Sequence, residues 1–344
     1  MDGSSRFLRA CRRLKADAVP VWFMRQAGRF LPGYRRLRRR HSMVGLCLDP
    51  EAAAEATLMP VRELGVDAAI LFSDILLPLR PMGVRLEFRK GEGPVLAPPV
   101  RTASAVSRLR VFDPREELSA VLDAVRLVRR ELGGTVPLIG FAGAPFTLAS
   151  YLIEGGPARD CVTAKRMMRA DPLLWHALMD KLARVAGAHL RAQAEAGAQA
   201  LQLFESWAGA LSREDYVRSV LPYSRRVLGE AVSTGVPVLH FAVGNSAFLE
   251  EFAGAGGVGV GVDWRIPIDE AFRRIGPGRV VQGNLDPAHL LLPRRELRRA
   301  VREVLRRAGG RRGHVFNLGH GVLPQTPPDN ARAVVEWVHE DSSR

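Results

Sequence analysis

Two arginines on either side of a short run of small residues could hold an anion. Arg25 and Arg29 flank Gln26, Ala27 and Gly28. A guanidinium is a planar fork of donors that can grip a carboxylate through two hydrogen bonds. Gly28 lets the backbone come close to a ligand, and successive N–H groups in such a turn can form an anion nest. The run predicts a carboxylate site, and its alternative is a pair of arginines in surface ion pairs.

Four more polar residues follow short apolar runs or stand in the loops just beyond them. Asp74 lies between apolar neighbours, where a carboxylate is costly unless it is paired or used. Tyr151, Ser206 and His320 follow three other apolar runs, and His320 stands between two glycines. Three of them have an ordinary alternative, namely a helix cap for Asp74, a core tyrosine for Tyr151 and a structural histidine for His320. Their recurrence in such places favours one shared site.

These residues are far apart in the chain, so a scaffold must bring them together. Short apolar runs, typical of strands buried on both faces, alternate with longer amphipathic runs. The expected strands are Val21–Met24, Ala68–Phe72, Pro137–Ala142, Ala200–Phe204, Val236–Phe241, Gly257–Val262, Arg279–Gly283 and His314–Leu318. The expected helices are Pro50–Leu64, Pro114–Leu132, Thr163–Ala196 with a break near Pro172, Asp215–Thr234, Phe248–Ala255, Ile268–Ile275, Arg294–Ala308 and Asp329–Glu340.

About eight strand–helix units predict an α/β fold, a single (β/α)8 TIM barrel over residues 1–344. A doubly wound sheet is the alternative. In a barrel the active site lies at the C-terminal face of the strands, which is where the polar residues above fall. Residues 84–100 are expected to form an inserted hairpin, and residues 1–18 a flexible N-terminal segment.

Composition narrows the class of protein. The chain has 344 residues, of which 47% are hydrophobic, enough to fill a large core. Its three cysteines are too few and too scattered for a disulfide framework or a zinc ribbon, and they fit a cytoplasmic protein. The sequence shows neither a signal peptide nor an apolar run long enough to span a membrane.

The net charge of +14 suggests an acidic partner, and nearly all of it comes from arginine. A nucleic-acid-binding protein is one interpretation, supported by the run Arg35–Arg40. However, the sequence contains no helix-turn-helix, finger or RNA-binding signature, and only 7% of its residues are aromatic. Solvated helix faces explain most of the charge, and no nucleic-acid partner is expected.

Seven segments together resemble the uroporphyrinogen decarboxylase family, in its order and spacing. They are PVWFMRQAGRFLPGYR (20–35), FSDIL (72–76), GAPFTLASYLIEGG (143–156), LQLFESWAG (201–209), GVDW (261–264), QGNLDP (282–287) and NLGHGVLPQTPPDN (317–330). The resemblance implies a carboxy-lyase that removes CO2 from the four acetate side chains of uroporphyrinogen III, giving coproporphyrinogen III in haem biosynthesis. It also implies a TIM barrel, a homodimer, and no metal or organic cofactor.

The resemblance carries roles to particular residues. Asp74, Arg25 and Arg29 are the expected catalytic residues. The residues expected to bind the tetrapyrrole substrate are Arg25, Gln26, Ala27, Gly28, Arg29, Asp74, Tyr151, Ser206 and His320. The sequence departs from the family's usual residues at Phe30, Gly33 and Gln325, none of which has an assigned catalytic role.

The expected chemistry needs no cofactor because the reduced pyrrole ring can act as its own electron sink. Protonation of a ring carbon gives an iminium-like cation, the acetate leaves as CO2, and a proton replaces it. The Asp74 carboxylate would stabilise that cation. For the proton donor, Arg29, a carboxyl of the substrate and His320 all stay open, with Arg29 first.

Two other functions can be weighed on sequence. Related barrel methyltransferases bind zinc through His-X-Cys and a later Cys, but here the comparable strand reads His240-Phe241-Ala242 and no cysteine follows Cys161. A glycine pattern at 254–259 matches a dinucleotide fingerprint. It follows a helix and leads into a strand, the reverse of the order that such a loop requires.

Overall fold

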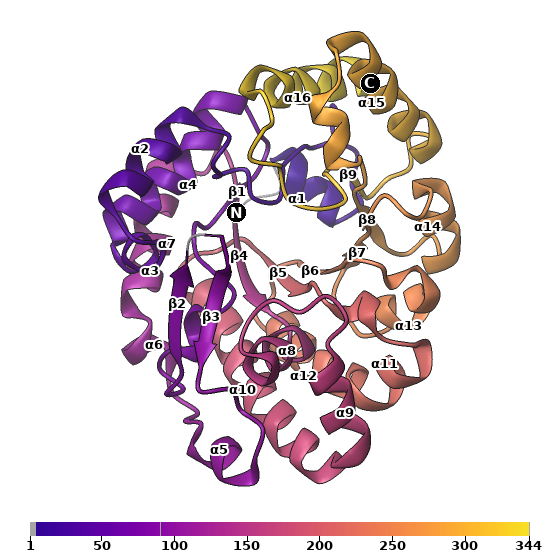
Figure 1. The fold of residues 1–344 in the computed structure, drawn as a ribbon. Coiled ribbons are helices and arrows are strands. Elements are labelled where there is room, and N and C mark those ends of the chain that lie inside the picture. Colours follow the sequence, from indigo (N-terminus) through magenta and orange to yellow (C-terminus); the bar gives the residue numbers. More distant parts are fainter. Residues whose placement is uncertain (1–4, 90, 344) are drawn as a thin grey trace.

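The computed structural model describes residues 5–89 and 91–343 and confirms the α/β barrel. Its parallel strands form one curled sheet in chain order, with helices around the outside (Figure 1). The strands are β1 (Ala69–Ile70), β4 (Leu138–Gly143), β5 (Ala200–Glu205), β6 (Val238–Ala242), β7 (Gly259–Gly261), β8 (Val280–Gln282) and β9 (His314–Val315).

The segment around Val21 closes the ring between β9 and β1. Val21 forms a parallel bridge with Phe316, and Phe316 N donates to Pro20 O at 2.8 Å. On the other side, Asp67 N donates to Val21 O at 2.7 Å. The expected strand Val21–Met24 therefore occupies the eighth strand position of the barrel. It pairs there only through an isolated bridge at Val21.

Side chains explain why this segment does not form a regular strand. Three of its backbone N–H groups donate to side-chain oxygens instead of to a neighbouring strand. The pairs are Val21 N to Asp67 Oδ2 at 2.7 Å, Phe23 N to Gln26 Oε1 at 3.1 Å, and Met24 N to Asn317 Oδ1 at 3.1 Å. These backbone N–H groups have hydrogen-bond partners without a β-ladder to a neighbouring strand, so the chain can turn at Arg25.

The helices largely follow the predictions. Three begin and end where expected: α4 (Pro50–Leu64), α14 (Ile268–Ile275) and α15 (Arg294–Ala308). For α4, the Asp49 side chain accepts from Ala52 N, and Gly65 ends the helix at φ +72°. The others that match an expected run are α6 (Pro114–Glu117), α7 (Ser119–Leu132), α9 (Val162–Ala170), α10 (Pro172–Glu195), α11 (Arg213–Ser219), α12 (Leu221–Val232), α13 (Leu249–Ala253) and α16 (Pro328–Ser342).

Several short elements were not predicted from sequence. They are α1 (Arg6–Cys11), α2 (Pro32–Arg40), α3 (Met43–Leu48), α5 (Ala103–Arg108), α8 (Pro145–Glu154) and the 3-10 turns η1 (Leu77–Leu79), η2 (Ala208–Ala210), η3 (Asn245–Phe248) and η4 (Pro287–Leu291). Helix α1 falls in the segment expected to be flexible, yet its Phe7 is fully buried. Residues 1–4 of that segment lie outside the described residues.

The predicted insert is a hairpin of β2 (Arg85–Arg89) and β3 (Gly93–Ala97). It packs against the end of α8, where Leu96 N donates to Gly155 O at 2.8 Å and Val100 N donates to Leu152 O at 2.9 Å. The hairpin therefore braces the helix that carries Tyr151. No helix within residues 5–89 and 91–343 is both long and apolar enough to cross a bilayer.

The barrel interior has a polar layer beneath an aromatic one. Trp22 Nε1 donates to Gln282 Oε1 at 3.0 Å, and Gln282 Nε2 donates to Gln202 Oε1 at 3.2 Å. These contacts cross the barrel, so Gln202 points inward, as do residues two places on and in register with it. The aromatic layer is Phe141, Phe204 and Phe241, whose ring centroids lie 5.6 and 5.8 Å apart in edge-to-face contacts.

Gln26 gives the first testable prediction. Its fully buried amide accepts from Phe23 N and donates to Ala68 O at 3.1 Å, so it ties the closing segment to β1. Gln26→Ala leaves both backbone groups without these partners, and we expect a loss of about 2–4 kcal/mol in the free energy of unfolding. Urea denaturation measures it, with the exposed Gln325→Ala as control. A loss no larger than that of the control contradicts this role.

Candidate active site

Arg25 directly follows the segment that closes the ring, at the C-terminal end of the barrel strands, which is the mouth of the barrel. Its backbone is left-handed at φ +59°, which is unusual for a residue with a side chain and costs about 1–3 kcal/mol. Its side chain lies on Gly321, where an added Cβ would come 2.4 Å from Arg25 Cδ. The backbone turn and the bare glycine surface together direct an exposed guanidinium across the mouth.

The Arg25 charge reaches three of the predicted site residues. It lowers the pKa of the Asp74 carboxyl, the Tyr151 hydroxyl and the His320 imidazole, although burial is the larger cause of the shift in each. The loops after β1 and β9 and helix α8 therefore converge on one cation, as a site at the C-terminal ends of the strands requires.

Asp74 is half-buried beneath this arginine. Its Oδ1 accepts from Leu76 N at 2.8 Å, which turns the chain into η1 and fixes the carboxylate. Removal from water raises the pKa of Asp74, while the Leu76 hydrogen bond and Arg25 act in the opposite direction. The buried carboxylate is thus held at a free-energy cost that a cationic ligand above it would relieve.

Tyr151 comes from α8, and Ser206 comes from the turn after β5. Both are half-buried, and Trp207 links them because its ring meets that of Tyr151 edge-on at 5.8 Å between centroids. Burial raises the pKa of the Tyr151 hydroxyl, and the nearby Asp74 charge adds to the rise. At neutral pH the hydroxyl therefore keeps its proton and can donate to a carboxylate oxygen.

His320 lies half-buried next to Arg25 and Arg265. Burial lowers the pKa of its imidazole to about 4, and Arg25 adds to this effect. The ring is therefore neutral in the empty site at physiological pH and carries no proton suited to general acid catalysis. An unfolded histidine titrates near 6.5, so this residue contributes to a loss of stability as the pH falls from 6.5 to about 4.

This protonation state is a testable prediction. In the free protein we expect the His320 imidazole to stay neutral down to about pH 4. We expect Arg25→Ala to raise the pKa only partly, because burial is the larger cause. Heteronuclear NMR of the ring nitrogens measures both, with His320→Gln to assign the signal. Titration near the ordinary value would contradict the buried placement beside Arg25.

The rest of the 25–29 loop divides into two groups. The Gln26 side chain is buried and hydrogen-bonds to the backbone of the fold, whereas Ala27 and Gly28 are half-buried at the mouth. Gly28 is required for the turn, because an added Cβ would lie 2.7 Å from Arg25 O. Arg29 is exposed and its charge acts on Tyr34 of α2 rather than on Asp74. Within the described part of the chain, neither Arg25 nor Arg29 pairs with a carboxylate.

Asp263 and its neighbours were not predicted as part of this region. Asp263 is buried after β7, accepts from Gly244 N at 2.8 Å and pairs closely with Arg265. Arg265 also lies over the Trp264 ring at 4.7 Å, and its charge reaches His320. The signal was available in GVDW, where an acid directly follows an expected strand. We interpret Asp263 as a support for this rim.

His240 lies on the outside of the barrel wall, away from the mouth. It pairs in register with the outward Leu203 and stacks on Phe252 of α13 at 3.7 Å between centroids. Burial lowers the pKa of its imidazole to about 3. No cluster of three His, Cys, Asp or Glu side chains suited to a metal occurs among the described residues. The zinc ligands of the methyltransferase alternative are thus not assembled there.

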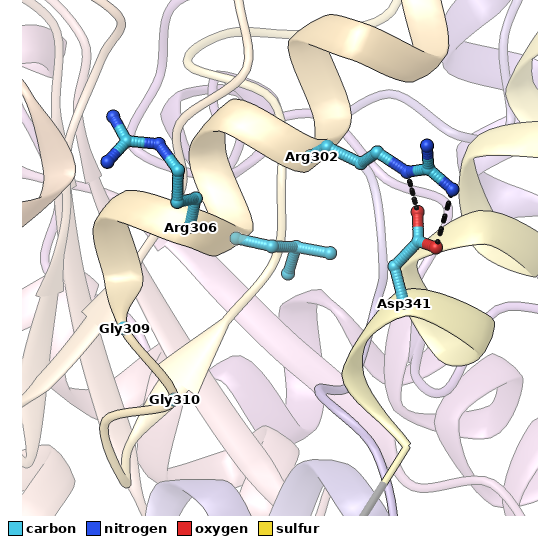
Figure 2. Close-up of a pocket in the computed structure, with 6 residues that line it drawn as sticks. Arg302, Arg306, Gly309, Gly310 and Asp341 are labelled. Carbon is cyan, nitrogen blue, oxygen red and sulfur yellow. Dashed lines mark hydrogen bonds and ion pairs between the residues drawn. The ribbon is translucent and has the colours of Figure 1, made fainter.

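A separate hollow of about 490 Å3 lies between α15 and α16 (Figure 2). It contains an ion pair, in which Arg302 Nε donates to Asp341 Oδ2 at 2.9 Å. Its Gly309 and Gly310 lie between the end of α15 and the start of β9, so it is at the opposite end of the barrel from the mouth. It takes no part in the site.

Fold and mouth together define an α/β-barrel enzyme, whose polar side chains gather where the strands end. A family model described as uroporphyrinogen decarboxylase (URO-D) matches residues 2–341. The protein of that name from Sorangium cellulosum is 57% identical over 97% of this chain and 95% of its own. The one from Carboxydothermus hydrogenoformans is 52% identical over 98% and 96%. The chain belongs to the uroporphyrinogen decarboxylase family.

Solved structures agree on the fold. A methyltransferase from Methanosarcina mazei superposes with a TM-score of 0.77 at 21% identity, over 97% of both chains. A B12-independent methionine synthase from Shewanella gives a TM-score of 0.59 at 10% identity, over 85% of this chain and 86% of that one. At these identities the likeness concerns the barrel alone.

Proposed function

We propose that this chain removes the four acetate carboxylates of uroporphyrinogen III as CO2 and releases coproporphyrinogen III. The observation that carries the proposal is the cluster at the mouth, where Arg25, which pairs with no described carboxylate, acts on Asp74, Tyr151 and His320. A polycarboxylate fits such a mouth because its acids meet a guanidinium and neutral donors. Family membership and the names of the relatives support the same substrate.

In the proposed mechanism the substrate ring supplies the electron sink. A proton added to the ring carbon beside an acetate makes the pyrrole cationic, and the C–C bond electrons of the departing CO2 neutralise it and leave an exocyclic methylene. That methylene takes up a proton to become a methyl group, and the ring carbon loses the proton that it gained. Asp74 faces the ring N–H groups and stabilises the cation. Because the pyrrole ring itself takes up the electrons, we propose that the decarboxylation needs no organic cofactor and no metal.

The binding roles are divided by charge. Arg25 and Arg29 hold acetate or propionate carboxylates, while Tyr151, Ser206 and His320 donate neutral hydrogen bonds. The aromatic layer of Phe141, Phe204 and Phe241 gives an apolar floor for a flat macrocycle. Because the His320 ring is neutral when the site is empty, Arg29 or a substrate carboxyl remains ahead of it as proton donor.

An anaerobic assay tests the proposal. The purified chain, treated with a chelator, is given reduced uroporphyrinogen III, and the products are separated by carboxylate number. We expect stepwise loss of four carboxylates with release of CO2. Unchanged substrate, or activity only after metal is added, contradicts the proposal. Two further parts of the proposal are a homodimer and a cytoplasmic location. The homodimer rests on the family resemblance, and sedimentation analysis checks it. The cytoplasmic location rests on the three scattered cysteines.

A further inference from the structure

A buried carboxyl lies directly behind the mouth. Glu205 is the last residue of β5 and is fully buried. It points outward, toward the helices, because it alternates with the inward Gln202 and Phe204. Its Oε1 accepts from Thr147 N at 2.9 Å and from Thr147 Oγ1 at 2.7 Å. Its Oε2 has no partner among the described residues.

These hydrogen bonds join the two segments that carry Tyr151 and Ser206. Thr147 is in the first turn of α8, and Tyr151 follows one turn later on the same helix. Thr147 Oγ1 also accepts from Trp207 N at 3.3 Å, so one hydroxyl connects Glu205, α8 and the turn after β5. Ser206 lies between Glu205 and Trp207 in that turn.

The outer side of Glu205 is uncharged. Tyr216 from α11 and Ser224 from α12 face it with neutral hydroxyl groups. Arg225 of α12 and Glu251 of α13 act on Tyr216, not on Glu205. Burial raises the pKa of Glu205 to about 7, while Thr147 and Ser224 act in the opposite direction.

We infer that Glu205 is a positioning residue: through Thr147 it fixes α8 against the Ser206–Trp207 turn, so that the hydroxyls of Tyr151 and Ser206 meet the substrate together. The inference rests on the proposed function for its kinetic consequences, but not for its structural ones. Glu205 itself does not touch the substrate, since it lies outside the barrel wall.

Three variants test this role. Glu205→Ala removes the link, and Thr147→Val removes the hydroxyl while nearly keeping the shape of the side chain. We expect each to raise KM for uroporphyrinogen about tenfold, with a smaller change in kcat, because lost ground-state contacts appear in KM. Glu205→Gln keeps an oxygen that can accept from Thr147, so its KM should stay close to that of the wild type. For the wild type we expect an inflexion near pH 7 in kcat/KM, and Glu205→Gln should abolish it.

A control separates positioning from general destabilisation. Val301→Ala removes a fully buried side chain on α15, away from the mouth, and should lower stability without changing KM. The structural readout is amide hydrogen exchange in residues 147–154, which should be faster in Glu205→Ala and Thr147→Val than in the control. If Glu205→Ala does not fold, Thr147→Val provides the same comparison.

The outcomes are distinct. A wild type without turnover contradicts the proposed function, and hydrogen exchange then still decides whether Glu205 holds α8. An active wild type with unchanged KM and exchange in Thr147→Val and Glu205→Ala overturns the inference. Two other results also overturn the inference. One is a rise in KM in Val301→Ala as large as that in Glu205→Ala, and the other is a rise in KM in Glu205→Gln as large as that in Glu205→Ala.

Discussion

Asp74→Asn should fold normally and lose about a thousandfold in kcat. A charge pair at about 4 Å in a partly shielded site, with an effective dielectric near 20, is worth roughly 4 kcal/mol, which corresponds to about a thousandfold in rate. Hydrogen bonds to the neutral ring take part of this energy already, so only the increment on ring protonation raises kcat. The estimate is therefore an upper value for the catalytic loss.

The structure explains why this variant should fold. Asparagine keeps an oxygen that can accept from Leu76 N, and it removes a carboxylate whose pKa is raised by burial. Because the folded pKa lies above the unfolded value, Asp74 contributes to a loss of stability as the pH rises through its folded pKa. Asp74→Asn should be at least as stable as the wild type at pH 7. Single-turnover decarboxylation measures the rate, and thermal unfolding checks the fold. Turnover near that of the wild type removes Asp74 from the mechanism.

Arg25→Ala has the second large expected effect, on substrate binding. Truncating one member of a shielded, hydrogen-bonded charge pair typically costs about 2–5 kcal/mol, so kcat/KM should fall roughly thirtyfold or more. Most of the loss should appear as a higher KM, since the carboxylate is bound before and during reaction. Arg25 lies on Gly321 and next to His320, so the loss should extend to the whole mouth.

Two further variants sharpen this prediction. Arg25→Lys keeps the charge but not the planar fork, and should recover only part of the affinity. Arg36→Ala removes an exposed arginine on α2 and controls for the general loss of positive charge. Steady-state kinetics with purified substrate measure all three. An unchanged KM in Arg25→Ala, or a rise as large in Arg36→Ala, contradicts the carboxylate clamp.

The sequence predicted helices that have capping residues at their ends and strands that are short apolar runs. Asp49 and Gly65 delimit α4, and the break at Asp171 appeared where Pro172 placed it. Helix α2 was missed because PGYRRLRRR is short and mostly arginine, and only Gly33, Tyr34 and Leu37 of it are buried. Its first turn packs on α4, where a Cβ on Gly33 would lie 2.8 Å from Met59 Sδ. That contact is tertiary and leaves no local pattern.

The site was predictable as a set of residues but not as a geometry. Strand-end position predicted that Arg25, Asp74 and His320 share one region, and in the structure the Arg25 charge acts on both Asp74 and His320. Nothing in the sequence indicates the left-handed backbone of Arg25 or the neutral state of His320, because both arise from neighbours distant in the chain. Gln26 looked like part of the binding loop, yet its amide is engaged inside the fold.

The most direct measurement is a crystal structure of the chain grown anaerobically with coproporphyrinogen III. We expect the Asp74 carboxylate within about 3 Å of the pyrrole nitrogens at the centre of the macrocycle, with a propionate on Arg25. A macrocycle bound elsewhere, or one whose nitrogens face away from Asp74 while its acids avoid Arg25, would contradict the account.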